Sequence, residues 1–555
     1  MRAVVLLVVT SASMLSAQLV PDVVLVNGKI VTVDDRFSIA QAVAVSGERI
    51  TAVGTTADIS KLAGPSTRRI DLRGRTVIPG LIDNHIHLLR AASTWAKELR
   101  FDGVESRKQA VELLRARVKG AGSGDWIYNI GGWTHHQFAD DPREFTRAEL
   151  DQIAPDRPVS LQESYYQVFL NSRALHELGI EAGKPDPAGF VKGSIKRDAA
   201  GNPTGVIKGD IAATRPVAAK LPKVAPSELE ASTLGLVKDM SRVGLTSFGV
   251  PGCDPDVLAI YRRWKEHGQL PVRTFCIEGG AAGNPDQVER VVQQIPKMKL
   301  FQGDSYIDTI AFGESVYSPL HDAMFATETR NTPAELALWR QIAMEIAKAG
   351  MPLHVHAELR DTIDGFLDQI EAINREHPIK NLRWQLAHIN QINAAELERM
   401  KKLGMYAAVH PWAVINGGIM HEGFGDGGYE MPPLATIQNS GIVWGFGTDG
   451  TAANQYLPFT TLAFAVTGKM AGGTRVLRQT ISREDALIAH TRKNSYFIFQ
   501  EDNLGSIQAG KLADLVVLDR DYLTVLPEEI RRIQAVMTMV GGRVVWDAGA
   551  AKAGK

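Results

Sequence analysis

Two histidines, His85 and His87, form the pair in this sequence with the clearest capacity for chemistry. They end the apolar stretch 77–88, which is typical of a short strand that emerges from its sheet. Side chains two residues apart on a strand point to one face, about 6–7 Å apart, so both imidazoles can approach one metal ion. Neutral imidazole is the commonest protein metal ligand. Two histidines alone at a strand end are more often ordinary polar residues than metal ligands. The metal interpretation therefore requires further ligands elsewhere in the chain.

Similar side chains occur at the ends of later apolar stretches. His356, with His354 two residues before it, His388 and Asp449 each end such a stretch. Each alone is more often a structural residue, but their matching positions favour one shared site. Imidazole and carboxylate ligands together suit Zn²⁺ or a similar divalent ion.

The elements that must position these side chains alternate between short apolar strands and amphipathic helical stretches, a pattern that predicts parallel α/β structure. Together with the stretch around His85, we expect eight strands, each followed by room for a helix, and hence a (β/α)8 TIM barrel. Its active site would lie at the C-terminal ends of the strands. The other strands are predicted at Leu245–Val250, Arg273–Gly279, Ile307–Ser315, Pro352–Ala357, Arg383–Ile389, Met405–His410 and Ile442–Asp449.

Both ends of the chain carry alternating apolar and polar residues with glycine turns, such as Asn27-Gly28 and Gly541-Gly542. We therefore expect a small β-sandwich built from both termini. The predicted organisation is a signal peptide at 1–17, the sandwich at 18–76 and 496–555, the barrel at 77–89 and 240–495, and a large insertion after the first barrel strand at 90–239.

The bulk composition is that of an ordinary globular enzyme. The chain has 555 residues, 45% of them hydrophobic, and a formal net charge of −1. This balance gives no indication of a nucleic-acid partner, so we expect a small-molecule substrate. Only Cys253 and Cys276 are present, which excludes a cysteine zinc cluster and leaves one disulfide or two thiols. The sequence leaves the oligomeric state open, a homo-oligomer included.

The N-terminus predicts export. Arg2 precedes the apolar run Ala3–Val9, and small residues follow through Ala17, which is the layout of a secretory signal peptide. The apolar run is too short to span a bilayer, so we expect no membrane attachment after cleavage. The mature protein is then expected to be periplasmic or extracellular. The alternative is that this run is a buried first strand.

Several motifs together resemble the amidohydrolase superfamily, and within it the amidohydrolase 3 branch, which includes N-substituted formamide deformylases and YtcJ-like proteins. The metal motifs are Val-Ile-Pro-Gly-Leu-Ile-Asp-Asn-His-Ile-His at 77–87, the later histidines and Gly-Thr-Asp at 447–449. Residues 505–518 match the structural motif near the C-terminus of the family. Further signals of the branch match Gly131–Trp133, Phe169–Leu175 and Gly205–Ile207.

The resemblance implies a role for each matching position. His85 and His87 would bind one metal ion, and His356 and His388 would serve a second ion or the substrate carbonyl. Asp449 would be both a ligand and the general base and acid, which takes a proton from a metal-activated water and passes it to the leaving amine. His388 would also help to stabilise the oxyanion.

The fourth predicted strand departs from the family pattern. Many members carry a carboxylated lysine there that bridges two metals, but this strand has no lysine and ends at Glu314. The carboxylate of Glu314 offers equivalent chemistry at the expected mouth of the barrel. The alternative is that Glu314 is an ordinary loop acid and that the site holds one metal.

Substrate contacts are expected from Tyr166, His410 and Trp133. Tyr166 stands where the branch often has Asp-Gly-His, Trp133 belongs to the Gly-Trp signal, and His410 ends the seventh strand. For His410 a packed strand terminus is an equally good interpretation. Because specificity resides in loops, the sequence does not identify the substrate.

These observations predict a metal-dependent hydrolase that cleaves a C–N bond of a small amide, formamide or cyclic amide. One alternative is a metal-dependent esterase, lactonase or peptidase of the same superfamily. A second alternative is a barrel that binds a ligand without catalysis, which the missing lysine would allow.

Overall fold

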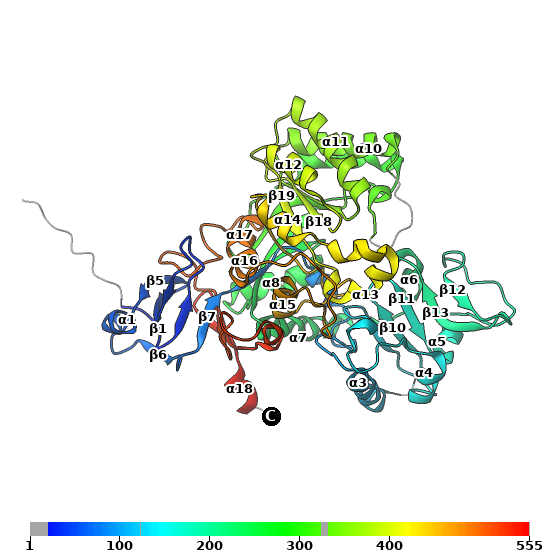
Figure 1. Ribbon diagram of the computed structural model, residues 1–555, viewed down its shortest axis with the longest axis horizontal. Helices are drawn as coiled ribbons and strands as arrows, with labels where there is room; N and C mark the ends of the chain where they lie inside the picture. The colour runs from blue at the N-terminus through cyan, green and yellow to red at the C-terminus, as the bar shows by residue number, and fades with distance from the viewer. Residues whose placement is uncertain (1–19, 123, 324–330, 554–555) are drawn as a thin grey trace, which may run out of the picture.

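An eight-stranded parallel sheet forms the centre of the protein in the computed structural model, which describes residues 20–122, 124–323 and 331–553 (Figure 1). The strands follow one another in sequence order around the sheet. They are β8 (Leu81–Asp83), β14 (Leu245–Pro251), β15 (Arg273–Glu278), β16 (Ile307–Glu314), β17 (Leu353–Ala357), β18 (Gln385–His388), β19 (Tyr406–Val409) and β20 (Trp444–Phe446). The predicted TIM barrel is confirmed.

Polar contacts at the seam between β8 and β20 nearly close the sheet into a barrel. The backbone N–H of Asn84 donates to the carbonyl of Phe446 at 3.2 Å. Thr448 donates to the Asp83 carboxylate through its hydroxyl at 2.6 Å and its N–H at 3.0 Å. The Asn494 side chain also donates to the carbonyl of Phe446 at 2.6 Å. The first and last strands are thereby held together at the end where the predicted ligands lie.

Amphipathic helices cover the outside of the barrel. In α11 (Arg360–Glu376) the buried residues Ile363, Phe366, Leu367 and Ile370 recur every three or four positions, which places them on one face. The other helices after barrel strands are α8 (Pro255–Glu266), α9 (Val288–Gln294), α10 (Pro333–Lys348), α12 (Ala394–Lys402), α13 (Ala413–Phe424), α14 (Leu434–Asn439), α15 (Pro458–Thr467), α16 (Arg483–Ala489) and α17 (Arg492–Phe497), while α7 (Leu229–Arg242) precedes β14.

The apolar stretch before His85 forms two strands rather than the single strand that was predicted. β7 (Thr76–Pro79) pairs with strands of the terminal β unit, and only β8 belongs to the barrel. Gly80 separates them where a Cβ atom would lie 2.3 Å from the Thr246 hydroxyl oxygen. The sequence could not separate them because both strands are buried and apolar.

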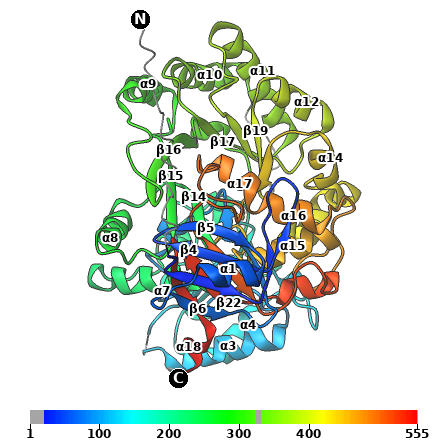
Figure 2. The same ribbon diagram turned by 90° about the vertical axis from the view of Figure 1, so that its left-hand side faces the viewer.

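Strands from both chain ends form two further sheets beside the barrel (Figures 1 and 2). One sheet has the order β5-β4-β1-β6, and the other has the order β23-β22-β21-β7-β2-β3. A shared apolar core, which includes Leu25, Val43, Leu515 and Met539, joins them. The strands are β1 (Val23–Val26), β2 (Lys29–Val31), β3 (Ile39–Ala40), β4 (Ala42–Ser46), β5 (Arg49–Gly54), β6 (Arg68–Asp71), β21 (Leu515–Leu518), β22 (Ala535–Val540) and β23 (Arg543–Asp547); helices α1 (Thr56–Leu62) and α18 (Ala548–Ala553) accompany them.

A five-stranded sheet with its own helices lies between β8 and β14 along the chain, on the opposite side of the barrel from the terminal sheets (Figure 1). Its strand order is β12-β13-β11-β10-β9. The elements are α2 (Leu88–Ala91), α3 (Arg107–Gly120), β9 (Ile127–Ile130), α4 (Arg147–Ile153), β10 (Val159–Glu163), β11 (Gln167–Leu170), α5 (Ser172–Glu177), β12 (Ile195–Arg197), β13 (Pro203–Lys208) and α6 (Ile211–Ala218).

Cys253 and Cys276 form a disulfide, which decides between the two alternatives that the sequence left open. The predicted signal peptide at 1–17 lies outside the described residues. Across the described part of the chain, every helix is too short or too polar to cross a membrane.

Candidate metal centre

The carboxylate of Glu314, at the end of β16, lies between two pairs of histidines. Its Oε1 atom is 3.1 Å from Nδ1 of His356 and 3.2 Å from Nε2 of His388. Its Oε2 atom is 3.7 Å from Nε2 of His85 and 3.6 Å from Nε2 of His87. One carboxylate thus faces two sets of ligand atoms with its two oxygens, as a bridging ligand does.

Asp449 completes the set around Oε2. Its Oδ1 atom lies 3.2 Å from Nε2 of His87 and 3.7 Å from Nε2 of His85. The backbone N–H of Asp449 donates to the carbonyl of His85 at 2.9 Å, so the turns after β8 and β20 support each other. The chain bends after β8 ends at Asp83, and the two imidazole rings stand edge to face, 5.3 Å apart. The two histidines therefore converge through this bend and not, as expected, along one strand face.

The positions of these atoms fit metal ions. The ligand atoms of His85, His87 and Asp449 lie within 4.8 Å of one another, and so do those of Glu314, His356 and His388. Nε2 of His85 is buried without a hydrogen-bond partner, although both carboxylates lie nearby. A buried polar atom without a partner is costly, so its lone pair is suited to a cation.

Burial keeps two of these rings in the form that binds metal. It lowers the pKa of His85 well below the ordinary value, and it also lowers the pKa of His388. For Glu314, burial alone would raise the pKa, but the surrounding histidines hold it well below normal. The site therefore offers neutral imidazoles and an ionised carboxylate, which are the protonation states that metal binding requires.

His356 behaves differently because Asp322 contacts its other nitrogen. Burial opposes the charged ring, yet Asp322 and Glu314 raise the pKa of His356 well above its usual range. Nε2 of His356 is 2.9 Å from Oδ1 of Asp322, and this carboxylate also accepts the N–H of Leu359 at 2.8 Å. Asp322 thus fixes the ring with Nδ1 towards Glu314, and a cation bound there would displace a proton.

A second layer of histidines lies behind the first. Nδ1 of His410 is 2.9 Å from Nδ1 of His388, and Nε2 of His410 is 3.2 Å from the side-chain oxygen of Asn84. Nε2 of His354 is 2.7 Å from Nδ1 of His85. These contacts orient His388 and His85 so that their Nε2 atoms face the carboxylates. Residues that hydrogen-bond to metal ligands usually orient them in this way.

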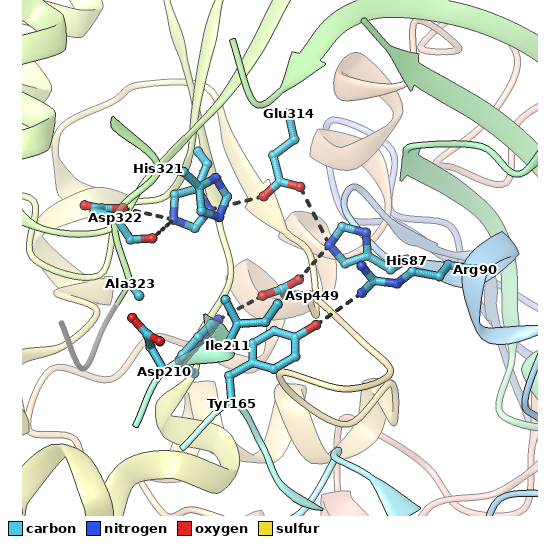
Figure 3. A pocket seen from close by; sticks show the side chains of 12 residues that line it. His87, Arg90, Tyr165, Asp210, Ile211, Glu314, His321, Asp322, Ala323 and Asp449 are labelled. Carbon is cyan, nitrogen blue, oxygen red and sulfur yellow. Dashed lines mark hydrogen bonds and ion pairs between the residues drawn. The ribbon is translucent and has the colours of Figure 1, made fainter. Parts of the chain in front are cut away.

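A cavity of about 160 Å³ opens over this cluster (Figure 3). Arg90 and Tyr165 lie on one side of it, and Nη2 of Arg90 donates to the Tyr165 hydroxyl at 3.1 Å. The lining residues are His87, Arg90, Tyr165, Asp210, Ile211, Glu314, His321, Asp322, Ala323, His356, Trp412 and Asp449.

The three predicted substrate contacts do not line this cavity. Trp133 is fully buried among Phe101, Phe138 and other aromatic rings of the insertion, and its Nε1 donates to Asn129. Tyr166 lies under the ammonium group of Lys208, 4.5 Å from its ring centre. His410 lies behind His388 and supports it from outside the cavity. Tyr165, and not its neighbour Tyr166, lines the cavity.

The sequence interpretation missed Arg90, Tyr165, His321 and Asp322. Arg90 carried one usable signal, since it follows His87 by three residues at the start of α2 and so points to the same side. Tyr165 lies in a turn, and His321 and Asp322 lie in an irregular segment after β16; the sequence does not encode the direction of either.

Comparisons with known proteins agree with this architecture. The family model described as "Amidohydrolase family" matches residues 68–546. The chain is 28% identical to N-substituted formamide deformylase from Arthrobacter pascens, over 94% of this chain and 97% of that one. It is 24% identical to the putative amidohydrolase YtcJ of Bacillus subtilis, over 88% of this chain and 92% of the relative.

A solved structure, an uncharacterised metal-dependent hydrolase from Pyrococcus furiosus, superposes with a TM-score of 0.61 at 20% identity, covering 90% of this chain and all of that chain. This likeness supports the fold. The family model covers the whole barrel, the whole insertion and part of the terminal sheets. The chain therefore belongs to the amidohydrolase family of hydrolases.

Proposed function

We propose that this protein is a metal-dependent amidohydrolase that cleaves the C–N bond of a small amide, formamide or cyclic amide. The observation that carries the proposal is the position of Glu314, whose two oxygens face separate histidine pairs at the mouth of the barrel. The formamide-cleaving activity in the name of the Arthrobacter relative supports the choice of bond.

The chain would hold two divalent ions. Histidine and carboxylate ligands favour zinc. His85, His87, Asp449 and Oε2 of Glu314 would hold one; His356, His388 and Oε1 of Glu314 would hold the other. Such an ion supplies a water molecule of lowered pKa and polarises a carbonyl group.

Asp449 is placed for proton transfer. Trp412 donates through Nε1 to Oδ2 of Asp449 at 3.1 Å, which fixes the carboxylate with Oδ1 near His87. Asp449 lines the cavity, so it can take a proton from the attacking water and pass it to the leaving nitrogen. His388 and His356 would hold the second ion, and that ion would stabilise negative charge on the carbonyl oxygen.

A substrate screen with zinc-loaded protein tests the proposal. N-Benzylformamide, a hydantoin, an N-acyl amino acid and a γ-lactone are compared side by side. We expect hydrolysis of at least one C–N substrate that disappears in the Asp449→Asn variant while zinc is retained. Turnover of the lactone alone would favour an esterase or lactonase, and metal-loaded protein without any turnover would favour a ligand-binding barrel.

The proposal includes export of the protein. The Cys253–Cys276 disulfide supports it, because such bonds persist mainly in oxidising compartments. Determining the N-terminal residue of protein secreted by a bacterial host tests it: cleavage near Ala17 is expected, and retention of Met1 in the cytoplasm would contradict it.

A further inference from the structure

We infer that Arg90 and the hydroxyl of Tyr165 bind a carboxylate of the substrate, so the substrates are small amides that carry a carboxylate close to the scissile bond. The inference rests on the proposed function. It names the part of the substrate that the sequence left unidentified.

Arg90 reaches the cavity from the first turn after the metal ligands. It follows His87 at the start of α2 and lines the cavity together with His87 and Asp449 (Figure 3). Its guanidinium donates from Nη2 to the Tyr165 hydroxyl. Among the described residues, no carboxylate lies within 4.0 Å of the Arg90 guanidinium.

Arg90 is exposed to solvent at the cavity and has no acidic partner among the described residues, whereas a buried and a half-buried arginine of this protein are paired with carboxylates. Arg273 is paired with Asp514 through two 2.9 Å hydrogen bonds. Arg100 is paired with both Glu98 and Asp102. A guanidinium has five N–H donors, and the hydrogen bond from Arg90 to the Tyr165 hydroxyl engages only one of them. The remaining donors are available to a ligand in the cavity.

The surroundings indicate the chemical class of that ligand. A guanidinium binds a carboxylate with two parallel hydrogen bonds. Arg90 is the one lysine or arginine among the described residues that line the cavity, so the site suits a single negative charge better than a phosphate dianion. Because Arg90 lies one helical turn from His87, the bound carboxylate would lie near the reacting carbonyl.

Two other roles for Arg90 give different experimental results. It could balance the charges of Asp449 and Glu314, although divalent ions would do so when bound. It could also contact the reacting carbonyl oxygen. In both cases its removal would affect substrates with and without a carboxylate alike.

Two formamides that differ only in the carboxylate separate these roles. N-Formylphenylalanine, as both enantiomers, is compared with N-formylphenethylamine, using zinc-loaded wild type and the Arg90→Gln variant. For the preferred enantiomer we expect kcat/KM in the wild type to be about 100-fold higher than for the neutral compound. Arg90→Gln should remove most of that preference and change kcat/KM for the neutral compound less than threefold.

Arg290→Gln is the matched control, because Arg290 is exposed on α9 and does not line the cavity. It should leave the preference unchanged. Tyr165→Phe should reduce the preference by a smaller factor than Arg90→Gln. Equal losses on both formamides in Arg90→Gln, or a wild type that prefers the neutral compound, would overturn the inference.

Binding provides a readout that does not depend on turnover. Calorimetric titration with N-acetylphenylalanine and with N-acetylphenethylamine should show tighter binding of the acid to the wild type and about equal binding of both to Arg90→Gln. If no formamide is hydrolysed, the proposed function fails while this titration still decides the inference. Acid binding of equal strength in wild type and variant would overturn it.

Discussion

The Nδ1 atoms of His388 and His410 lie 2.9 Å apart, so one ring donates the hydrogen bond and the other accepts it. Nε2 of His410 faces the side-chain oxygen of Asn84, which can only accept, so this nitrogen carries the proton. His410 must then accept at Nδ1, and His388 donates there. The lone pair of His388 is thereby left at Nε2, directed at Glu314.

Replacing His410 tests this arrangement. His410→Leu removes the acceptor and should weaken zinc binding about 10–100-fold, which is the usual effect of losing an outer partner of a metal ligand. His410→Gln keeps an acceptor and should recover much of the affinity. Zinc competition with a chelating dye measures both, and equal affinities for the Leu and Gln variants would contradict the argument.

Asp449→Asn should nearly abolish turnover without unfolding the protein. The amide keeps the shape of the carboxylate and an oxygen that can accept from Trp412, but it cannot take a proton. We expect kcat to fall about 10²–10⁴-fold. Steady-state kinetics on protein of measured zinc content checks this, and a loss explained by missing zinc alone would assign Asp449 to metal binding only.

The buried ion pair between Arg273 and Asp514 joins the barrel to the terminal sheets. Both side chains are almost inaccessible, at 0% and 3% exposure. Asp514→Asn leaves the guanidinium charge buried and should cost about 3–5 kcal/mol of unfolding free energy. Adding Arg273→Met removes that charge and should restore part of the loss. Urea unfolding measures both, and additive losses in the double variant would contradict this.

His490 should reduce stability in mild acid. Its Nδ1 donates to the carbonyl of Ile82 in β8, and burial lowers the pKa of His490 to about 4. Between pH 6.5 and pH 4 the unfolded chain binds a proton at this residue while the folded chain does not, so stability falls as the pH falls.

The His490→Asn variant keeps a donor but cannot titrate in this range. Relative to the variant, the wild type should lose about 3 kcal/mol between pH 7.5 and pH 4. Urea unfolding at several pH values measures the difference. A constant difference across the range would show that His490 does not carry this effect.

The sequence predicted the barrel well because parallel strands are buried on both faces and appear as continuous apolar runs. The predicted strand Leu245–Val250 matches β14 almost residue for residue. The same reasoning failed at β7, since an apolar strand does not reveal which sheet it joins. His85 and His87 were brought together by a backbone bend that the strand argument did not contain.

Substrate contacts were harder to predict because turns decide which side chain faces the cavity. The backbone turns at Ser164, which has φ +46°, and this turn directs Tyr165 rather than Tyr166 to the site. The sequence Tyr165-Tyr166 does not indicate which of the two side chains such a turn directs to the cavity. Trp133 was expected at the site from its motif, but its size and apolar character place it in the core of the insertion.

The number of zinc ions that each chain retains, in the wild type and in Glu314→Gln, tests the central claim most directly. Glutamine keeps the size of the side chain but loses the charge that would bridge two cations. After zinc loading and desalting, mass spectrometry should find about two equivalents in the wild type and one or fewer in the variant. One equivalent in both proteins would contradict the bridging role of Glu314.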